Sequence, residues 1–132
     1  MKILRIGIAS YEDMKARTMA IARGELKPGA DEPKLWFTSI ESLARVLSDK
    51  NRALLDLIIE REPQSIAELE TLSGRAKSNL SRTLKNMERF GLVELLKEEG
   101  GRVRPRVPYG EIQLDLPMGS RRLQSTAFFV SN

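Results

Sequence analysis

Residues 65–90 read S-I-A-E-L-E-T-L-S-G-R-A-K-S-N-L-S-R-T-L-K-N-M-E-R-F, and this stretch decides the fold. The S-x-x-E pattern of residues 65–68 is a capping box, which predicts the start of a short helix. Residues 73–74, Ser-Gly, predict a tight turn. A longer helix is expected over residues 76–90, ended by Gly91. Two helices separated by a short glycine-containing turn indicate a helix-turn-helix.

The longer helix is predicted to have two unlike faces when successive residues are placed about 100° apart. An apolar stripe, expected to be buried, consists of Ala76, Leu80, Thr83, Leu84 and Met87. The opposite side carries cationic and small polar groups, namely Arg75, Ser78, Arg82, Lys85 and Arg89, with Asn79 and Asn86 at one margin and Ser81 at the other. The first acid of the helix, Glu88, lies near the stripe, so the outward face is expected to be free of negative charge.

Downstream, the hydrophobic period changes from helical to extended. Residues 92–96 predict a strand, residues 98–101 a hairpin turn, and residues 103–107 a return strand. Alternation places three arginines on one side of this hairpin: Arg102, Arg104 and Arg106. Residues 112–116 alternate as well and predict one more strand.

Upstream, residues 38–47 and 50–61 have helical spacing, and the first of these helices is expected to be capped by a box of Thr38 and Glu41. The order helix, helix, turn, helix, hairpin predicts an α+β fold with a winged helix-turn-helix domain over residues 34–116. Residues 1–33 are expected to form an N-terminal extension of one strand and one helix, the helix being capped by Ser10.

The tail, residues 117–132, has no clear period, and its origin stays open between native sequence and an expression-vector remnant. In the N-terminal helix, the apolar or small residues exceed what one buried stripe requires: Met14, Thr18, Met19, Ile21 and Ala22. They form either a homodimer interface or a cover for the core, and the sequence favours neither.

Charge is concentrated in one third of the chain. Residues 75–106 contain nine basic and four acidic residues, a net charge of +5, whereas the whole chain carries +4. A cationic excess confined to one segment is typical of a nucleic-acid-binding face. Arginine and asparagine can hydrogen-bond base edges, and serine and lysine can hold phosphates. We therefore expect double-stranded DNA to contact the hairpin arginines and the following residues of the longer helix: Arg75, Lys77, Ser78, Asn79, Ser81, Arg82 and Lys85.

Two other interpretations stay open for these features. Cationic residues on a helix are often only a solvated surface, and arginines on an edge strand can simply protect it from aggregation. A helix-turn-helix can also bind proteins, so a module that neutralises a partner toxin is the alternative function.

Composition excludes several classes of site. The chain contains neither cysteine nor histidine, which excludes disulfides, zinc sites built on these residues, and Ser-His-Asp or Cys-His catalysis. No phosphate-binding loop, dinucleotide motif or calcium loop occurs. We expect no enzymatic activity, catalytic residue, metal or cofactor. No apolar run reaches the roughly 18 residues of a membrane span, and no secretory leader pattern precedes residue 10, so a cytoplasmic location is expected.

The chain also resembles a family of small prokaryotic winged-helix regulators that are MarR-like in their helix-turn-helix, some of them described as antitoxins. The resemblance covers about residues 35–116, and its most specific element is S-N-L-S-R-T-L at residues 78–84. It implies a homodimer that regulates transcription, as a repressor, with a toxin encoded alongside. Carried over by position, it implies DNA contacts from Lys77, Ser78, Asn79, Ser81 and Arg82. The long terminal helices that dimerise typical MarR proteins are missing, so the resemblance does not supply a dimer interface.

Overall fold

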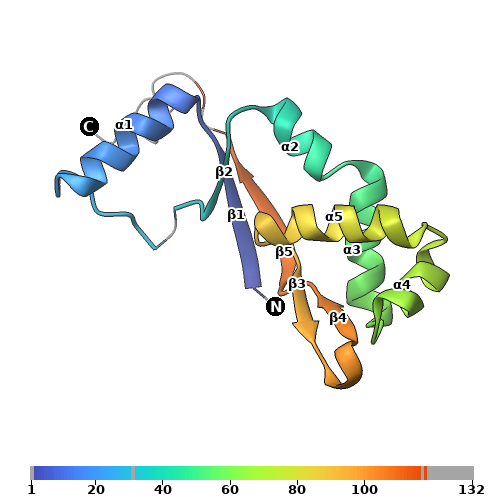
Figure 1. Cartoon of the computed structure of the whole chain (residues 1–132). Coiled ribbons are helices and arrows are strands. Elements are labelled where there is room, and N and C mark those ends of the chain that lie inside the picture. Colours follow the sequence, from blue (N-terminus) through green and yellow to red (C-terminus); the bar gives the residue numbers. More distant parts are fainter. Residues whose placement is uncertain (1, 31, 117, 119–132) are drawn as a thin grey trace. The chain divides into compact units, whose positions relative to one another are not determined.

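A computed structural model describes residues 2–30, 32–116 and 118 of the chain (Figure 1). Within these residues the fold is mixed, with five α-helices, a three-stranded sheet and a two-stranded hairpin. None of the described helices combines the length and the apolar character that crossing a membrane requires. The expected tail lies outside the described residues except for Met118.

The chain divides into two compact units. The helical unit comprises Met1–Lys2 and Ala44–Gly110, and the sheet unit comprises Ile3–Leu43 and Glu111–Asn132. The sequence predicted domain boundaries at residues 33/34 and 116/117. The contacts divide the chain differently, because residues 35–43 and 111–115 group with the N-terminal segment.

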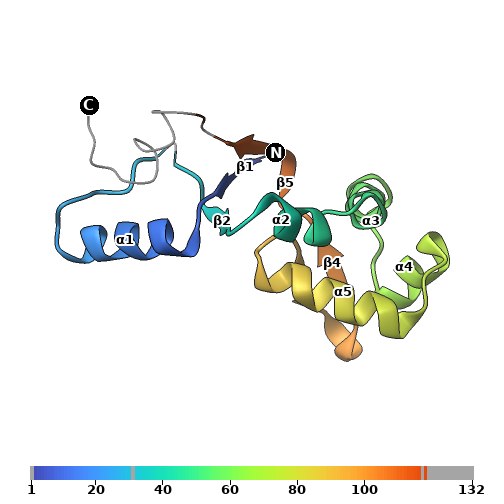
Figure 2. The same cartoon turned by 90° about the horizontal axis from the view of Figure 1, so that it is seen from above.

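Three helices and the hairpin build the helical unit. Helices α3 (Asp49–Arg61), α4 (Ile66–Ser73) and α5 (Lys77–Arg89) pack so that α4 contacts both α3 and α5 (Figure 2). Strand β3 contacts α5, and strand β4 contacts α3 and α4. The apolar stripe of α5 supplies Leu80, Leu84 and Met87, all essentially inaccessible to solvent. Burial of such side chains is the main favourable term in folding.

Hydrogen-bonded caps set the ends of these helices. Ser65 accepts a hydrogen bond from the backbone N–H of Glu68 (3.0 Å), which confirms the predicted start of α4. The Glu68 carboxylate accepts from the backbone N–H of Gln64 rather than of Ser65. Gly74 closes α4 in the left-handed conformation (φ +72°), where a glycine has no steric cost.

The hairpin is shorter than the sequence predicted. Strand β3 spans Glu94–Lys97 and pairs antiparallel with β4 (Val103–Arg106). Residues 92–93 precede the strand and are buried instead of pairing. A one-turn 3-10 helix, Glu99–Gly101, forms the tip, and the positive φ angles of its two glycines allow the reversal.

The sheet unit has the strand order β2-β1-β5. Strand β1 (Lys2–Ile8) leads into α1 (Tyr11–Ala22), and the chain returns to place β2 (Leu35–Phe37) parallel to β1. A parallel pair needs such a crossover. Ser10 caps α1 through the backbone N–H of Asp13, as predicted. The last strand, β5 (Tyr109–Asp115), flanks β1 on the other side.

Gly7 of β1 allows the side chain of Trp36 to pack closely against this strand. Gly7 pairs with Trp36 across the two strands, and a Cβ on Gly7 would lie 2.5 Å from the Trp36 ring. The guanidinium of Arg17 on α1 sits 5.3 Å from the centroid of the same ring and also pairs with Glu32. The indole is therefore held between β1 and α1.

Two sequence predictions were wrong in this region or at α5, and one strand was missed. Helix α2 (Ile40–Val46) is capped by Ser39, which exchanges hydrogen bonds with Ser42, and not by the box of Thr38 and Glu41. Strand β2 was not predicted, because three residues are too few to show a period. Ala76 precedes α5 as an exposed N-cap and does not belong to the buried stripe.

Candidate nucleic-acid interface

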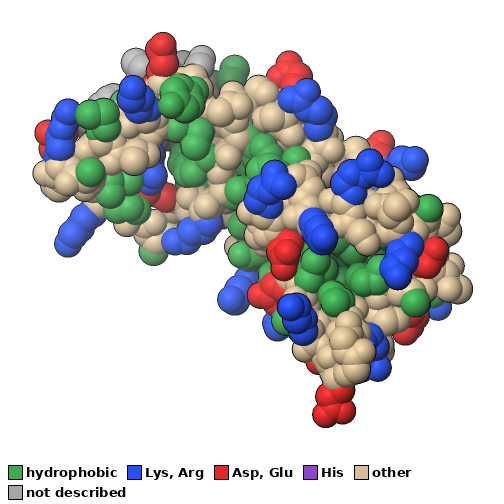
Figure 3. All heavy atoms as spheres, in the orientation of Figure 1, with side chains coloured by type: hydrophobic (Ala, Val, Ile, Leu, Met, Phe, Trp, Pro, Cys, Tyr) green, Lys and Arg blue, Asp and Glu red, His purple; other side chains and the backbone are tan. Residues whose placement is uncertain are grey.

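The outward face of α5 is exposed and cationic. The exposed members of the predicted DNA-binding set on this helix are Lys77, Ser78, Asn79, Arg82 and Lys85, whereas Ser81 is half-buried. Figure 3 shows this face with blue lysine and arginine side chains spread over α5 and red acidic ones toward the hairpin. In the first turn of α5 no residue is acidic. The face therefore offers positive charge and hydrogen-bond donors from one rigid element.

Arg75 differs from its neighbours, because it lies in the turn before α5 and is held by three intramolecular hydrogen bonds. Its Nε donates to Asn79 Oδ1 (2.7 Å), and its Nη2 donates to Thr83 Oγ1 (3.0 Å). Its Nη1 donates to Asn51 Oδ1 on α3 (3.3 Å), and Asn51 Nδ2 in turn donates to the carbonyl of Val46 (3.0 Å). The guanidinium thus joins the start of α5 to α3.

These hydrogen bonds differ from what the sequence predicted for Arg75 and Asn79. Arg75 and Asn79 were expected to present free side chains, but each uses part of its hydrogen-bonding capacity inside the chain. Asn51 could not be found from the sequence pattern, because it lies 24 residues before Arg75 and carries no local signal.

Two of the three hairpin arginines are paired with acids. Arg104 Nε lies 2.8 Å from Glu98 Oε1, and Arg106 Nη1 lies 3.5 Å from Glu94 Oε1. Arg102 is exposed, and no ion pair among the described residues includes it. The expected row of three arginines is thus partly neutralised. The pair of Glu94 and Arg106 could have been predicted, since they are directly opposite each other in the hairpin register.

The ion pair between Arg104 and Glu98 has a measurable effect on the pKa of Glu98. The hydrogen bond from Arg104 is the main cause that lowers the pKa of Glu98 from its ordinary value; desolvation opposes it, and the charges of Arg104 and Arg102 add to the lowering. The ionised carboxylate therefore stabilises the folded hairpin above the pKa of the unfolded chain. That contribution is lost as pH falls through the lower pKa of the folded chain.

We expect the Glu98 carboxyl carbon, followed by NMR, to titrate with a midpoint below 4.5. In Arg104→Ala the midpoint should move back toward 4.5, because the hydrogen-bond donor is gone. A wild-type midpoint at or above 4.5 would show that the pair does not persist in solution.

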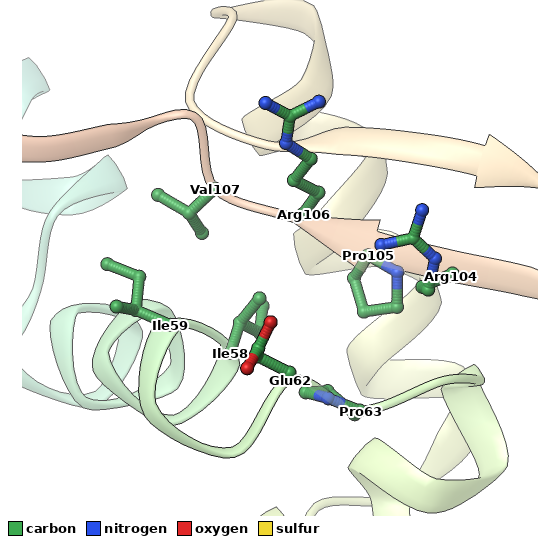
Figure 4. A pocket seen from close by; sticks show the side chains of 8 residues that line it. All are labelled: Ile58, Ile59, Glu62, Pro63, Arg104, Pro105, Arg106 and Val107. Carbon is green, nitrogen blue, oxygen red and sulfur yellow. The ribbon is translucent and has the colours of Figure 1, made fainter. Parts of the chain in front are cut away.

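A cavity of about 390 Å³ lies between the end of α3 and strand β4 (Figure 4). Its walls combine charged residues, Glu62, Arg104 and Arg106, with the apolar side chains of Ile58, Ile59, Pro63, Pro105 and Val107. Arg104 and Arg106 border it, but their guanidinium groups point away from α3 in Figure 4. The heads of Arg104 and Arg106 therefore lie on the same side of β4, away from α3.

Comparisons with known proteins give one match. The sequence model of the HVO_A0114 family matches residues 46–114, which cover α3 to α5, the hairpin and most of β5. Neither the curated proteins nor the solved structures contain a match.

Proposed function

The chain belongs to the HVO_A0114 family, and we propose that it is a DNA-binding transcriptional regulator with a winged helix-turn-helix. One observation carries the proposal: the outward face of α5 is cationic and free of acids at its start, on a helix that follows α4 through a tight turn. In this interpretation α5 is the recognition helix, and the β3–β4 hairpin is the wing.

The chemistry of α5 suits the major groove of B-DNA. An α-helix fits that groove, and arginine can bind guanine O6 and N7 through two hydrogen bonds. Arg82 is exposed near the middle of the outward face and is the candidate for this contact. Ser78 and Lys85 flank it and are suited to phosphates, which fix the register of the helix without reading sequence.

The wing is proposed to contact the backbone or the minor groove. Arg102 is exposed next to the glycine-containing tip and is available to a phosphate without breaking an ion pair. Arg104 and Arg106 would have to exchange Glu98 and Glu94 for phosphate, and surface ion pairs of this kind are worth only about 0–1 kcal/mol.

We further propose that the chain acts as a homodimer formed through the sheet unit. All exposed large hydrophobic side chains among the described residues lie in this unit: Ile3, Tyr11, Met19, Ile40, Ile112, Leu114, Leu116 and Met118. Ile112, Leu114 and Leu116 alternate along β5 and its end, so they share one side of a strand. A second copy would bring a second recognition helix to a two-fold symmetric operator, about 34 Å away along the DNA.

A binding titration tests the function. The protein is titrated against a duplex from the region upstream of its own gene and against a scrambled duplex, at several salt concentrations. Repression by this chain predicts tight, steeply salt-dependent binding to the first duplex and weak binding to the second. Failure to bind either duplex at low salt would overturn the proposal. Sedimentation at the same concentrations tests the dimer, and a monomer at all of them would refute that part.

Alanine substitutions in the recognition helix and in the wing are expected to affect DNA binding differently. Arg82→Ala should cost about 1–3 kcal/mol on the specific duplex and much less on the scrambled one, because a base contact is lost. Arg104→Ala should weaken binding to both duplexes and reduce the salt slope by about one unit. Arg52→Ala, an exposed arginine on α3, is the control and should change neither. Equal losses from Arg82→Ala on both duplexes would argue against base reading by α5.

A protein-binding antitoxin is the second candidate function. The exposed apolar side chains of the sheet unit favour it, because such a patch can equally receive a partner protein. Specific co-purification of a protein encoded beside this gene, together with no effect on DNA, would make this the leading function.

A further inference from the structure

We propose that Arg75 orients the amide of Asn79 so that Asn79 reads a guanine or a thymine in the major groove and disfavours adenine. This inference rests on the proposed DNA-binding function. It assigns to Arg75 the role of a positioning residue and to Asn79 a specific place in the recognition of bases.

The orientation of the amide follows from the chemistry of its partner. An arginine Nε–H can only donate, so the Asn79 atom 2.7 Å away must be the acceptor, which is Oδ1. The Nδ2 group is then the part of the amide left to meet a ligand. Asn79 is exposed in the first turn of α5, where recognition helices contact bases.

Arg75 is itself fixed on two further sides. Its other two nitrogens donate to Thr83 on α5 and to Asn51 on α3. Asn51 is oriented by its own bond to the Val46 carbonyl, so its Oδ1 is the atom turned toward Arg75. The side chain before α5 is therefore preorganised, and reversing the Asn79 amide would break the shortest of these bonds.

The major groove distinguishes bases by donors and acceptors. Guanine presents two acceptors, N7 and O6, and thymine presents the acceptor O4. Adenine presents one acceptor, N7, beside the donor N6–H₂, and cytosine presents the donor N4–H₂. A free asparagine binds adenine by using its oxygen and its nitrogen together. The bond from Arg75 occupies one of the two lone pairs of Oδ1 and places the guanidinium beside it, so Nδ2 is the group most open to the DNA. Guanine is then matched best and thymine next, and adenine is disfavoured relative to both because its N6–H₂ would have to share Oδ1 with the Arg75 guanidinium.

Selection from a pool of randomised duplexes tests this inference with the full chain. We expect the wild type to enrich sequences with a guanine or thymine at one position that depends on Asn79. In Asn79→Asp, an oxygen replaces the outward nitrogen while Arg75 keeps its acceptor. The preferred base at that single position should then change to cytosine, with the other positions unchanged. In Arg75→Ala the amide can reverse, and adenine should become accepted there.

Asn86→Asp is the matched control. Asn86 lies two helical turns after Asn79, on the same side of α5, and the substitution introduces the same charge. It should lower the affinity for all sequences without changing the base at the position assigned to Asn79. Thermal unfolding of each variant shows that selection is done on folded protein.

The outcomes separate the two proposals. Enrichment of adenine by the wild type, or a uniform loss of affinity in Asn79→Asp with no change of base, would overturn the role of Asn79 while leaving DNA binding intact. Enrichment of no sequence, with no binding to the pool at low salt, would overturn the proposed function and this inference with it.

Discussion

Leu80→Ala is expected to lower the free energy of unfolding of the helical unit by about 2–5 kcal/mol. Leu80 is 0% exposed on α5, so truncation removes buried methyl groups and leaves a cavity that close-packed neighbours fill only in part. Because whole domains are stable by only about 5–15 kcal/mol, this is a large part of the total. Chemical denaturation followed by circular dichroism measures it.

The same substitution at Leu114 is the control. Leu114 is 46% exposed on β5, and its truncation should cost much less than that of Leu80. DNA binding gives a second readout, because Arg82 lies two residues after Leu80 on the opposite face of α5. Below the unfolding transition, Leu80→Ala should retain sequence preference. If Leu80→Ala lowers the free energy of unfolding no more than Leu114→Ala does, α5 is not packed as described.

Gly7→Ala is expected to destabilise the sheet unit by about 1–3 kcal/mol, the usual cost of overpacking. The added Cβ would lie 2.5 and 2.6 Å from two carbons of the Trp36 ring and 3.0 Å from Pro33. The ring cannot retreat freely, since the guanidinium of Arg17 sits on it. Near-ultraviolet circular dichroism reports on Trp36, the single tryptophan of the chain.

A double-mutant cycle isolates the steric cause. In a Trp36→Ala background, Gly7→Ala should cost far less than in the wild type, because the atoms that it meets are gone. Equal costs in the two backgrounds would show that the effect comes from the strand and not from the contact with Trp36. The proposed binding to DNA through α5 should survive Gly7→Ala, whereas the proposed dimer formation through the sheet unit should weaken.

Local patterns accounted for most of the helical unit. The cap at Ser65, the turn at Gly74 and the buried stripe of α5 each depend on residues within a few positions of one another. The cap and the turn were confirmed, and the stripe was confirmed at Leu80, Leu84 and Met87 but not at Ala76, which is exposed, or at Thr83, which is half-buried. The exposed cationic face of α5 follows from the same periodicity. Predicted and observed ends of the helices differ by at most two residues. At the start of α2 the difference arises because Ser39, and not Thr38, makes the capping hydrogen bonds.

Long-range pairing could not be predicted in the same way. The return of β5 to β1 and the parallel pairing of β1 with β2 join segments far apart in the chain, and a period within one segment does not say which strand it pairs with. The hydrogen bond between Arg75 and Asn51 could not be predicted either, since it forms only when α3 and α5 are packed together.

The sequence by itself determined which segments are helical, which side of α5 is buried, and that positive charge gathers between residues 75 and 106. These properties depend on side-chain type and spacing alone. Only the tertiary structure decided that Arg75 is held by Asn79, Thr83 and Asn51, and that Arg104 and Arg106 face carboxylates. Hydrogen bonds and ion pairs depend on distances of about 3 Å, which exist only once the elements have packed.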